Sequence, residues 1–273
     1  MENEVWISRN ITSQIREGLK SRPALFITGM RQTGKTSLLK RNFSDFQFVS
    51  FDKIENVREA EENPGKFLNS FSSPVVLDEA QYVPGIFREI KYRIDENRNQ
   101  YGRWILTGSQ NFLLMKDISE SLAGRIGIFH LHTLSSNEIR NSIDIGNRIN
   151  NSLVLGGFPE IWSNPNISPE NFFDDYVTTY GERDLRRILD ITNLRDFQRL
   201  LKSCAFRVGQ LINYSDLARD VGVSSVTIKT WINALETGGL IYLLQPYYRN
   251  LGKRLIKAPK LYFSDSGLLC YLL

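Results

Sequence analysis

The sequence has little cysteine and no long apolar run, and each shortage excludes a class of protein. Cys204 and Cys270 are the only cysteines and lie far apart, which excludes a disulfide framework or a cysteine zinc site. No apolar run approaches the length of a membrane span. The segment Met1–Asn10 carries Glu2 and Glu4 and has no apolar core, unlike a signal peptide. A cytoplasmic protein without a membrane partner is therefore expected.

The remaining composition is that of an ordinary soluble protein. The 273 residues are 41% hydrophobic and 23% charged, and the net charge is +4. A chain of this length accommodates about two domains. Because the net charge is small, basic residues matter only where they gather locally.

The most informative segment is a glycine-containing loop that follows a short apolar run. Residues 24–28 have the pattern of a buried strand, and the residues that follow are Gly29, Met30, Arg31, Gln32, Thr33, Gly34, Lys35, Thr36 and Ser37. Gly29 and Gly34 let the backbone N–H groups turn toward phosphate oxygens. Lys35 is predicted to neutralise the β and γ phosphates, and the Thr36 hydroxyl to ligate Mg²⁺. The pattern predicts that this loop binds a nucleotide.

The base of that nucleotide is expected to be adenine. Neither Asn-Lys-x-Asp nor Thr-Lys-x-Asp, the sequences that select guanine, occurs in the chain. ATP with Mg²⁺ is therefore the predicted ligand.

A second apolar run ends in two adjacent carboxylates. Residues 74–77 have the pattern of a buried parallel strand, and Asp78 and Glu79 follow at its end. Asp78 is predicted to hold Mg²⁺, while Glu79 would orient and deprotonate the attacking water. The pair predicts hydrolysis of ATP in addition to binding.

A third apolar run, residues 103–106, ends in small polar residues that include Thr107 and Ser109. The tip of this strand is expected beside the other two, where either hydroxyl would reach the γ-phosphate or the water. An ordinary turn after a strand has the same pattern.

Arg125 precedes a further apolar run, residues 126–131, and two interpretations of it stay open. An arginine at such a position can stabilise transition-state charge on the phosphate of its own or a neighbouring subunit. A salt bridge at a helix end would explain the residue equally well.

The order of these elements predicts an α/β P-loop NTPase domain, a doubly wound parallel sheet, over residues 1–135. A mostly helical linker is expected at 136–192. It contains Gly156 and Gly157, which break any helix and would suit a hinge or an interdomain contact.

A winged helix-turn-helix domain is expected over residues 193–263. Two helices, at 214–222 and 225–236, are separated by a short turn with a serine cap. Strands expected at 240–244 and 260–263 would form the wing.

Two sets of residues in this domain are candidates for contacts with double-stranded DNA. Phosphate contacts are expected from three basic residues of the wing, where no acidic residue intervenes: Arg249, Lys253 and Arg254. Base-edge contacts are expected from three residues near the start of the second helix: Thr227, Lys229 and Thr230.

These motifs together resemble the prokaryotic AAA-like ATPases that carry a domain of unknown function, DUF4143. The resemblance rests on the loop, Val-Leu-Asp-Glu, Leu-Thr-Gly-Ser, Leu-Ala-Gly-Arg, Gly-Gly-Phe-Pro-Glu and Glu-Arg-Asp, and it extends over essentially the whole chain. It implies a P-loop ATPase of the STAND and archaeal-ATPase neighbourhood, with a winged helix and then a nuclease-like domain.

Family members of this kind continue beyond the position of Leu273. Residues 264–273 are therefore expected to be the stump of a missing C-terminal domain, without nuclease-like activity. The apolar segment 267–273 is expected either to pack back onto the winged helix or to drive self-association.

The sequence thus favours an ATPase that couples its nucleotide state to a winged helix. Two alternatives remain: a nucleotide-responsive DNA-binding protein with little turnover, and a winged helix used only to dock a protein partner.

Overall fold

The chain forms two compact units in the computed structural model, which describes residues 5–109, 122–142, 152–180, 194–247 and 257–273. Ser8–His132 form the first, here called the sheet unit. Thr133–Leu273 together with Met1–Ile7 form the second, here called the helical unit. The chain therefore passes between the units at two places, 7/8 and 132/133.

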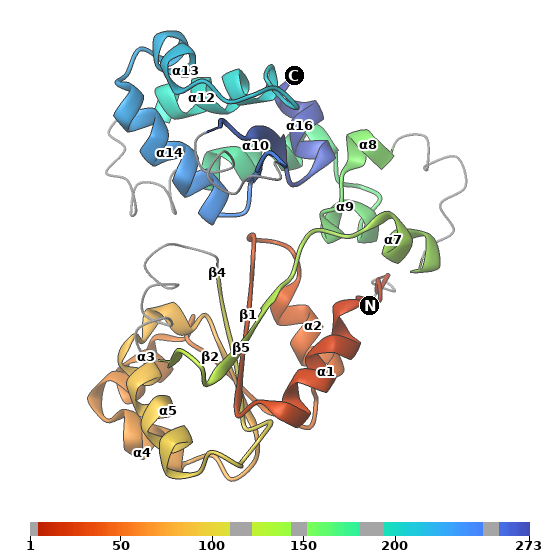
Figure 1. The fold of residues 1–273 in the computed structure, drawn as a ribbon. Helices are drawn as coiled ribbons and strands as arrows, with labels where there is room; N and C mark the ends of the chain where they lie inside the picture. The colour runs from red at the N-terminus through yellow and green to blue at the C-terminus, as the bar shows by residue number, and fades with distance from the viewer. Residues whose placement is uncertain (1–4, 110–121, 143–151, 181–193, 248–256) are drawn as a thin grey trace. The chain divides into compact units, whose positions relative to one another are not determined.

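A five-stranded parallel sheet forms the centre of the sheet unit (Figure 1). Its strands, in the spatial order β2-β3-β4-β1-β5, are β1 Ala24–Gly29, β2 Gln47–Ser50, β3 Val75–Asp78, β4 Trp104–Ser109 and β5 Ile126–His130. β4 lies between β1 and β3, so the carboxyl ends of the three strands that carry the predicted motifs are neighbours. The predicted P-loop NTPase sheet is confirmed.

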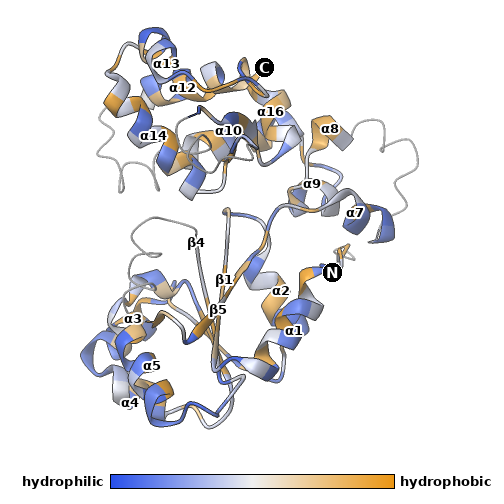
Figure 2. Cartoon of the chain, in the orientation of Figure 1, coloured by the Kyte–Doolittle hydropathy of each residue, from blue (hydrophilic) through white to orange (hydrophobic). Residues whose placement is uncertain are grey.

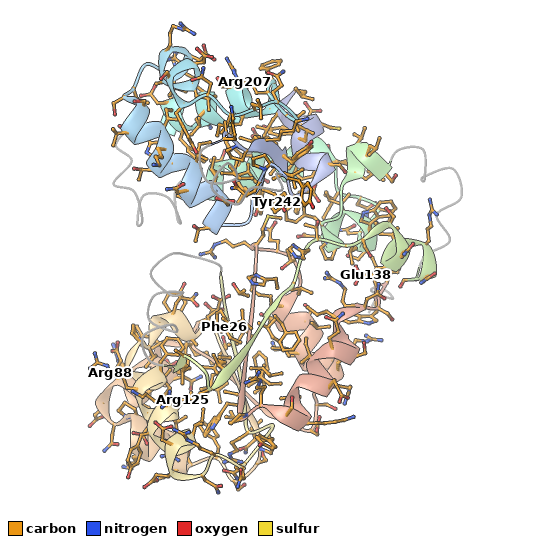
Figure 3. All side chains as sticks on the ribbon, in the orientation of Figure 1. Phe26, Arg88, Arg125, Glu138, Arg207 and Tyr242 are labelled. Atoms are coloured by element: carbon orange, nitrogen blue, oxygen red, sulfur yellow. The ribbon has the colours of Figure 1, made fainter. Side chains whose placement is uncertain are left out.

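Alternate strand residues face two separate cores. Phe26 and Leu77 face a core made with α3 Ile54–Glu62, α4 Pro64–Asn69 and α5 Gly85–Glu96 (Figure 3 labels Phe26). Ile27 and Val76 face a core made with α1 Ile11–Ser21 and α2 Lys35–Asn42. Burial of each such side chain stabilises the fold by ~1.5–3 kcal/mol. The sheet is buried on both faces, as parallel sheets usually are (Figure 1).

Helices dominate the helical unit. They are α7 Ser136–Ser142, α8 Ser152–Leu155, α9 Pro159–Ser163, α10 Pro169–Tyr180, α12 Leu194–Ala205, α13 Tyr214–Val221, α14 Ser225–Thr237 and α16 Ser266–Leu272. Two short antiparallel strands, β6 Ile241–Leu244 and β7 Lys260–Phe263, form a separate sheet.

Local capping explains where α13 and α14 begin. The Asn213 side chain accepts hydrogen bonds from Ser215 N and Asp216 N at the start of α13. The Ser224 hydroxyl accepts one from Thr227 N at the start of α14. Between the helices Gly222 has φ +88, a left-handed conformation that ends α13 at little cost only for glycine.

The C-terminal segment belongs to the packed helical unit, although the sequence suggested a separate stump. α16 contacts α8, α10, α12 and β7, and Leu268 and Leu272 on it are buried. The helix is largely hydrophobic (Figure 2), and the unit's own elements cover Leu268 and Leu272, while Leu273 after the helix is exposed. Its contacts with α12 and β7 lie in the region expected to be the winged helix, whereas α8 and α10 belong to the region expected to be a helical linker. Self-association through this segment stays a prediction.

Gly156 and Gly157 pack directly against the start of α16. Gly157 N donates to Asp265 Oδ2 at 2.8 Å, while Asp265 Oδ1 accepts from Gly267 N and Leu268 N. A Cβ atom at Gly156 would lie 2.2 Å from Asp265 Oδ1. The glycine pair thus permits a close contact around the buried Asp265 carboxylate.

No helix in the part of the chain that the structure describes has the length and apolar character that crossing a membrane requires.

Candidate phosphate-binding site

The loop between β1 and α2 has the backbone of an anion-binding nest. Gln32 and Gly34 have φ +59 and +87, whereas Thr33 between them does not have a positive φ. Such an alternation turns successive N–H groups to one side of the backbone. At the start of the loop, a Cβ atom on Gly29 would lie 2.1 Å from Leu131 O, so only glycine fits there. Lys35 begins α2, and the positive end of that helix points toward the loop.

The Lys35 ammonium lies inside the curl of this loop. Its side chain is buried, and Nζ donates to Gly29 O at 3.0 Å and Met30 O at 2.8 Å. The Thr33 hydroxyl, also buried, donates to Met30 O at 2.9 Å. The loop thus holds a positive charge where its N–H groups converge.

The other predicted loop residues surround this centre. Met30 is buried, Arg31 and Thr36 are partly buried, and Gln32 and Ser37 are exposed, Ser37 in the first turn of α2.

Asp78 connects the loop to the acidic strand. Thr36 Oγ1 donates to Asp78 Oδ2 at 2.9 Å, although the two residues are far apart in sequence. Asp78 itself is buried, with 2% of its surface exposed. A hydroxyl and a carboxylate oxygen therefore meet beside the predicted phosphate position, and both are hard donors of the type that Mg²⁺ prefers.

Thr107 supports this carboxylate and is not directed at a phosphate. Its fully buried hydroxyl donates to Asp78 Oδ1 and accepts from Glu79 N at 3.2 Å. The expectation that Thr107 contacts the γ-phosphate is corrected here, because its hydroxyl is enclosed between two residues of the acidic strand. Ser109 pairs in register with Gly29, the first loop residue, but its side chain lies outside the described residues.

Glu79 has an unusual backbone conformation. It is one of two non-glycine residues with positive φ among those described, with φ 57 and ψ 45. Its carboxylate accepts a hydrogen bond from Gln81 Nε2, in the short η1 helix Ala80–Tyr82. Such strain persists mainly at functional sites, where the surrounding structure over-determines it.

Arg125 lies away from this site, near the amino ends of the strands of the same sheet. It directly precedes Ile126, which pairs with Ala24 at the amino end of β1, whereas the loop follows the carboxyl end. Its guanidinium forms two hydrogen bonds with Asp95 of α5, at 2.8 and 2.9 Å. Figure 3 labels Arg125 on the sheet unit. This pairing lowers the pKa of Asp95 and raises the pKa of Arg125. The prediction of a charge-stabilising arginine for its own subunit's phosphate is corrected, because parallel strands place the two positions at opposite ends.

The three base-edge candidates on α14 differ in exposure and contacts. Lys229 and Thr230 are exposed, whereas the Thr227 hydroxyl lies 2.7 Å from Ser224 Oγ in the cap of the helix. The Thr227 hydroxyl thus takes part in the cap that Ser224 forms, and the base-edge assignment of these residues stays a prediction. The wing candidates, Arg249, Lys253 and Arg254, lie outside the described residues.

Sequence reasoning did not find two residues that contact the site. Gln81 donates a hydrogen bond to the Glu79 carboxylate. The spacing of two residues after Glu79 is the sequence feature that could have indicated this contact. Arg9 donates to Thr33 O in the loop at 2.8 Å and also to His132 O. No local pattern pointed to Arg9, because its partners are distant in sequence.

With the loop, the acidic strand and their hydrogen bonds in place, the comparison with known families can be set beside the structure of this unit. Residues 21–140 match the AAA domain family. This match, together with the loop geometry, supports a nucleotide-binding ATPase of the AAA type. The matched segment ends at residue 140, eight residues after His132, the last residue of the sheet unit.

A different family covers the rest of the chain. Residues 146–273 match a domain of unknown function, DUF8612, where the resemblance had suggested DUF4143. The two matched segments thus meet near residues 140–146, and the description of the second family names no activity.

Individual proteins match nearly the whole chain. Two uncharacterized proteins, from Mycobacterium bovis and Mycobacterium tuberculosis, are each 30% identical over 270 residues, or 97% of this chain. The chain spans 59% of the length of each of these relatives. The solved structure of a Walker-type ATPase from Pyrococcus abyssi matches with a TM-score of 0.64 and 16% identity, over 99% of this chain and 97% of that one. At that identity the likeness concerns the fold alone.

Proposed function

We propose that the AAA domain binds ATP with Mg²⁺ and hydrolyses it. The observation that carries the proposal is the 2.9 Å hydrogen bond from Thr36 Oγ1 to Asp78 Oδ2. Lys35 directly precedes Thr36 in the chain, and Glu79 directly follows Asp78. It brings the phosphate loop and the acidic strand end together at one point, which nucleotide hydrolysis requires and simple anion binding does not.

The donor set at this point suits Mg²⁺. Thr36 and Asp78 would hold the ion, since both offer hard oxygen atoms and the remaining positions can be filled by water and phosphate. When bound, Mg²⁺ would neutralise charge on the phosphate oxygens. Thr107 fixes the orientation of the Asp78 carboxylate through its hydroxyl.

Each of the remaining residues has a separate task in the proposed reaction. The loop N–H groups and the Lys35 ammonium bind the phosphates. Glu79 orients the attacking water and accepts its proton, because it directly follows the strand tip that carries Asp78. The hydrogen bond from Gln81 holds the Glu79 carboxylate beside that tip. ATP is preferred to GTP because the chain lacks the sequences that select guanine.

The proposal is tested by measuring binding and turnover separately. Lys35→Ala is expected to abolish ATP binding. Glu79→Gln, which keeps the shape of the side chain, should bind ATP and hydrolyse it at least ~10²-fold more slowly. Turnover should also require Mg²⁺. The matched control is Glu17→Gln, an exposed carboxylate on α1 that pairs with Lys20. Glu79→Gln turnover equal to that of the wild type would refute the role of Glu79.

We infer double-stranded DNA as a candidate second ligand, with α13, α14, β6 and β7 acting as a winged helix. Residues 194–273 carry eleven Lys and Arg but five Asp and Glu, so positive charge concentrates in this part. The exposed residues of α14 share one face: Ser225, Val226, Lys229, Thr230 and Asn233. Its opposite face is buried, so the exposed one is available to a groove of DNA.

This second candidate is tested by the salt dependence of DNA binding. Replacing Arg249, Lys253 and Arg254 with alanine should weaken binding and flatten the log–log salt slope by up to ~0.9 per lost phosphate contact. ATP turnover measured with and without duplex DNA then shows whether the two activities are coupled. DNA binding with negligible turnover would support a nucleotide-responsive binding protein. No DNA binding at low salt would leave the α14 face for a protein partner.

A further inference from the structure

Arg9 connects the phosphate loop to the place where the chain leaves the sheet unit. It follows the first crossing, at 7/8, and its side chain is 8% exposed. One guanidinium nitrogen donates to Thr33 O in the loop at 2.8 Å, and another donates to His132 O. His132 is the last residue before the second crossing. A single rigid group thus binds one loop carbonyl and one carbonyl at the crossing.

The bond to Thr33 O also sets the direction of a phosphate-binding N–H group. The carbonyl of Thr33 and the N–H of Gly34 belong to one planar trans peptide, so they point in opposite directions. A donor that holds Thr33 O therefore fixes where the Gly34 N–H points. Gly34 adopts φ +87 at this position, in the nest that would receive phosphate.

Two further contacts tie the same crossing segment to the loop. Leu131 N donates to Thr28 O at 2.7 Å, directly before the first loop residue. A Cβ atom on Gly29 would lie 2.1 Å from Leu131 O. These two contacts hold the segment 131–132 against the end of β1, whereas the bond from Arg9 reaches the turn of the loop itself, at Thr33 O.

We propose that Arg9 is a positioning residue that couples the phosphate loop to the second crossing between the units. It orients the Thr33–Gly34 peptide for phosphate. When a bound nucleotide orders the loop, Arg9 transmits that ordering to His132. The inference rests on the proposed nucleotide binding and adds a route by which the bound state reaches the point where the chain leaves the sheet unit.

Hydrogen–deuterium exchange with and without nucleotide tests this coupling. The Leu131 amide exchanges only when its hydrogen bond to Thr28 O opens. If that opening also disrupts the loop, then bound nucleotide must slow the exchange, by up to ~100-fold at a free nucleotide concentration of one hundred times Kd. Leu38 N, which donates to Gly34 O in the first turn of α2, serves as the internal reference for binding at the loop. ATP with Mg²⁺, or a slowly hydrolysed analogue, is supplied at the same multiple of Kd for each variant.

Arg9→Met removes both hydrogen bonds while it retains much of the side-chain length. We expect nucleotide still to slow exchange at Leu38 in this variant, but the effect at Leu131 to fall to less than ~3-fold, because the crossing then opens independently of the loop. The ATP affinity should fall by ~10-fold, as expected for one misdirected donor. The control Arg16→Met also removes an arginine-to-carbonyl bond, to Asn42 O, and should behave as the wild type.

Arg9→Lys is the second variant if Arg9→Met does not fold. Lysine keeps the charge but lacks the planar fork that spans two carbonyls, so the same loss at Leu131 is expected. Equal slowing at Leu131 in the Arg9 variants and the wild type would overturn the inference, as would a wild type in which nucleotide protects Leu38 but not Leu131. A wild type that binds no nucleotide would refute the proposed function as well.

Discussion

The hydroxyl group of Thr107 donates a hydrogen bond to the Asp78 carboxylate, and both side chains are buried. The same hydroxyl oxygen accepts a hydrogen bond from Glu79 N. One side chain on β4 therefore fixes the carboxylate of Asp78 and the backbone of Glu79. The geometry of the proposed metal and water sites depends on this contact between neighbouring strands.

Thr107→Val should reduce stability and turnover together. The substitution keeps the shape but leaves Asp78 Oδ1 without its buried donor, at a cost of ~1–3 kcal/mol in unfolding free energy. The Mg²⁺ concentration for half-maximal turnover should rise, because Asp78 is no longer held in place. Urea unfolding and a Mg²⁺ titration measure the two effects.

Thr28→Val is the matched control on the adjacent strand. Its hydroxyl is also fully buried but has no hydrogen-bond partner in the part of the chain that the structure describes. The same change there should cost no stability. If both valine variants behaved alike, the Thr107 hydroxyl would have no special role.

Replacements of Glu79 should separate activity from stability. Glu79→Ala and Glu79→Gly both remove the carboxylate and should both lose turnover. Glu79→Gly should be more stable than Glu79→Ala by ~1 kcal/mol, because φ 57 is strained for any residue with a Cβ atom. Thermal unfolding of the two variants measures the difference. An alanine variant as stable as the glycine variant would mean that the backbone is not left-handed in solution.

Arg125→Ala should leave turnover unchanged at protein concentrations where copies do not associate. The reason is distance: Arg125 and the loop lie at opposite ends of β1, roughly 15 Å or more apart. If Arg125 acts on a neighbouring copy, a loss should appear only where copies associate. Mixing with Lys35→Ala, which supplies an intact Arg125, should then restore activity. If turnover neither falls in the variant nor recovers in the mixture at any protein concentration, the role of Arg125 is its salt bridge with Asp95.

Two glycines in the helical unit should differ sharply in their tolerance of alanine. Gly156 and Gly222 have φ +66 and +88, so a Cβ atom strains both, by ~1–2 kcal/mol each. At Gly222 nothing lies within 4 Å of the added atom, whereas at Gly156 the Asp265 carboxylate lies 2.2 Å away. Gly156→Ala should therefore cost a further ~1–3 kcal/mol in urea unfolding. Equal costs would contradict the packing of residues 156–157 against α16.

Features that depend on nearby residues followed from the sequence. The phosphate loop is a local pattern, since Gly29, Gly34, Lys35 and Thr36 act through the backbone they themselves form. The caps of α13 and α14 are equally local, because Asn213 and Ser224 bond N–H groups two or three residues away. The two expected helices accordingly lie close to α13 and α14 in the structure.

Features that depend on which strands are neighbours required the tertiary structure. The Thr107 hydroxyl faces Asp78 because β4 lies between β1 and β3, an order that helix packing on both faces of the sheet decides. Arg125 lies far from the loop because it comes before its strand, and its partner Asp95 is 30 residues earlier in the chain. Arg9 bonds a carbonyl 123 residues away, which no local pattern could indicate. Sequence thus determined the chemistry of the loop and the acidic strand, while packing decided which side chains face them.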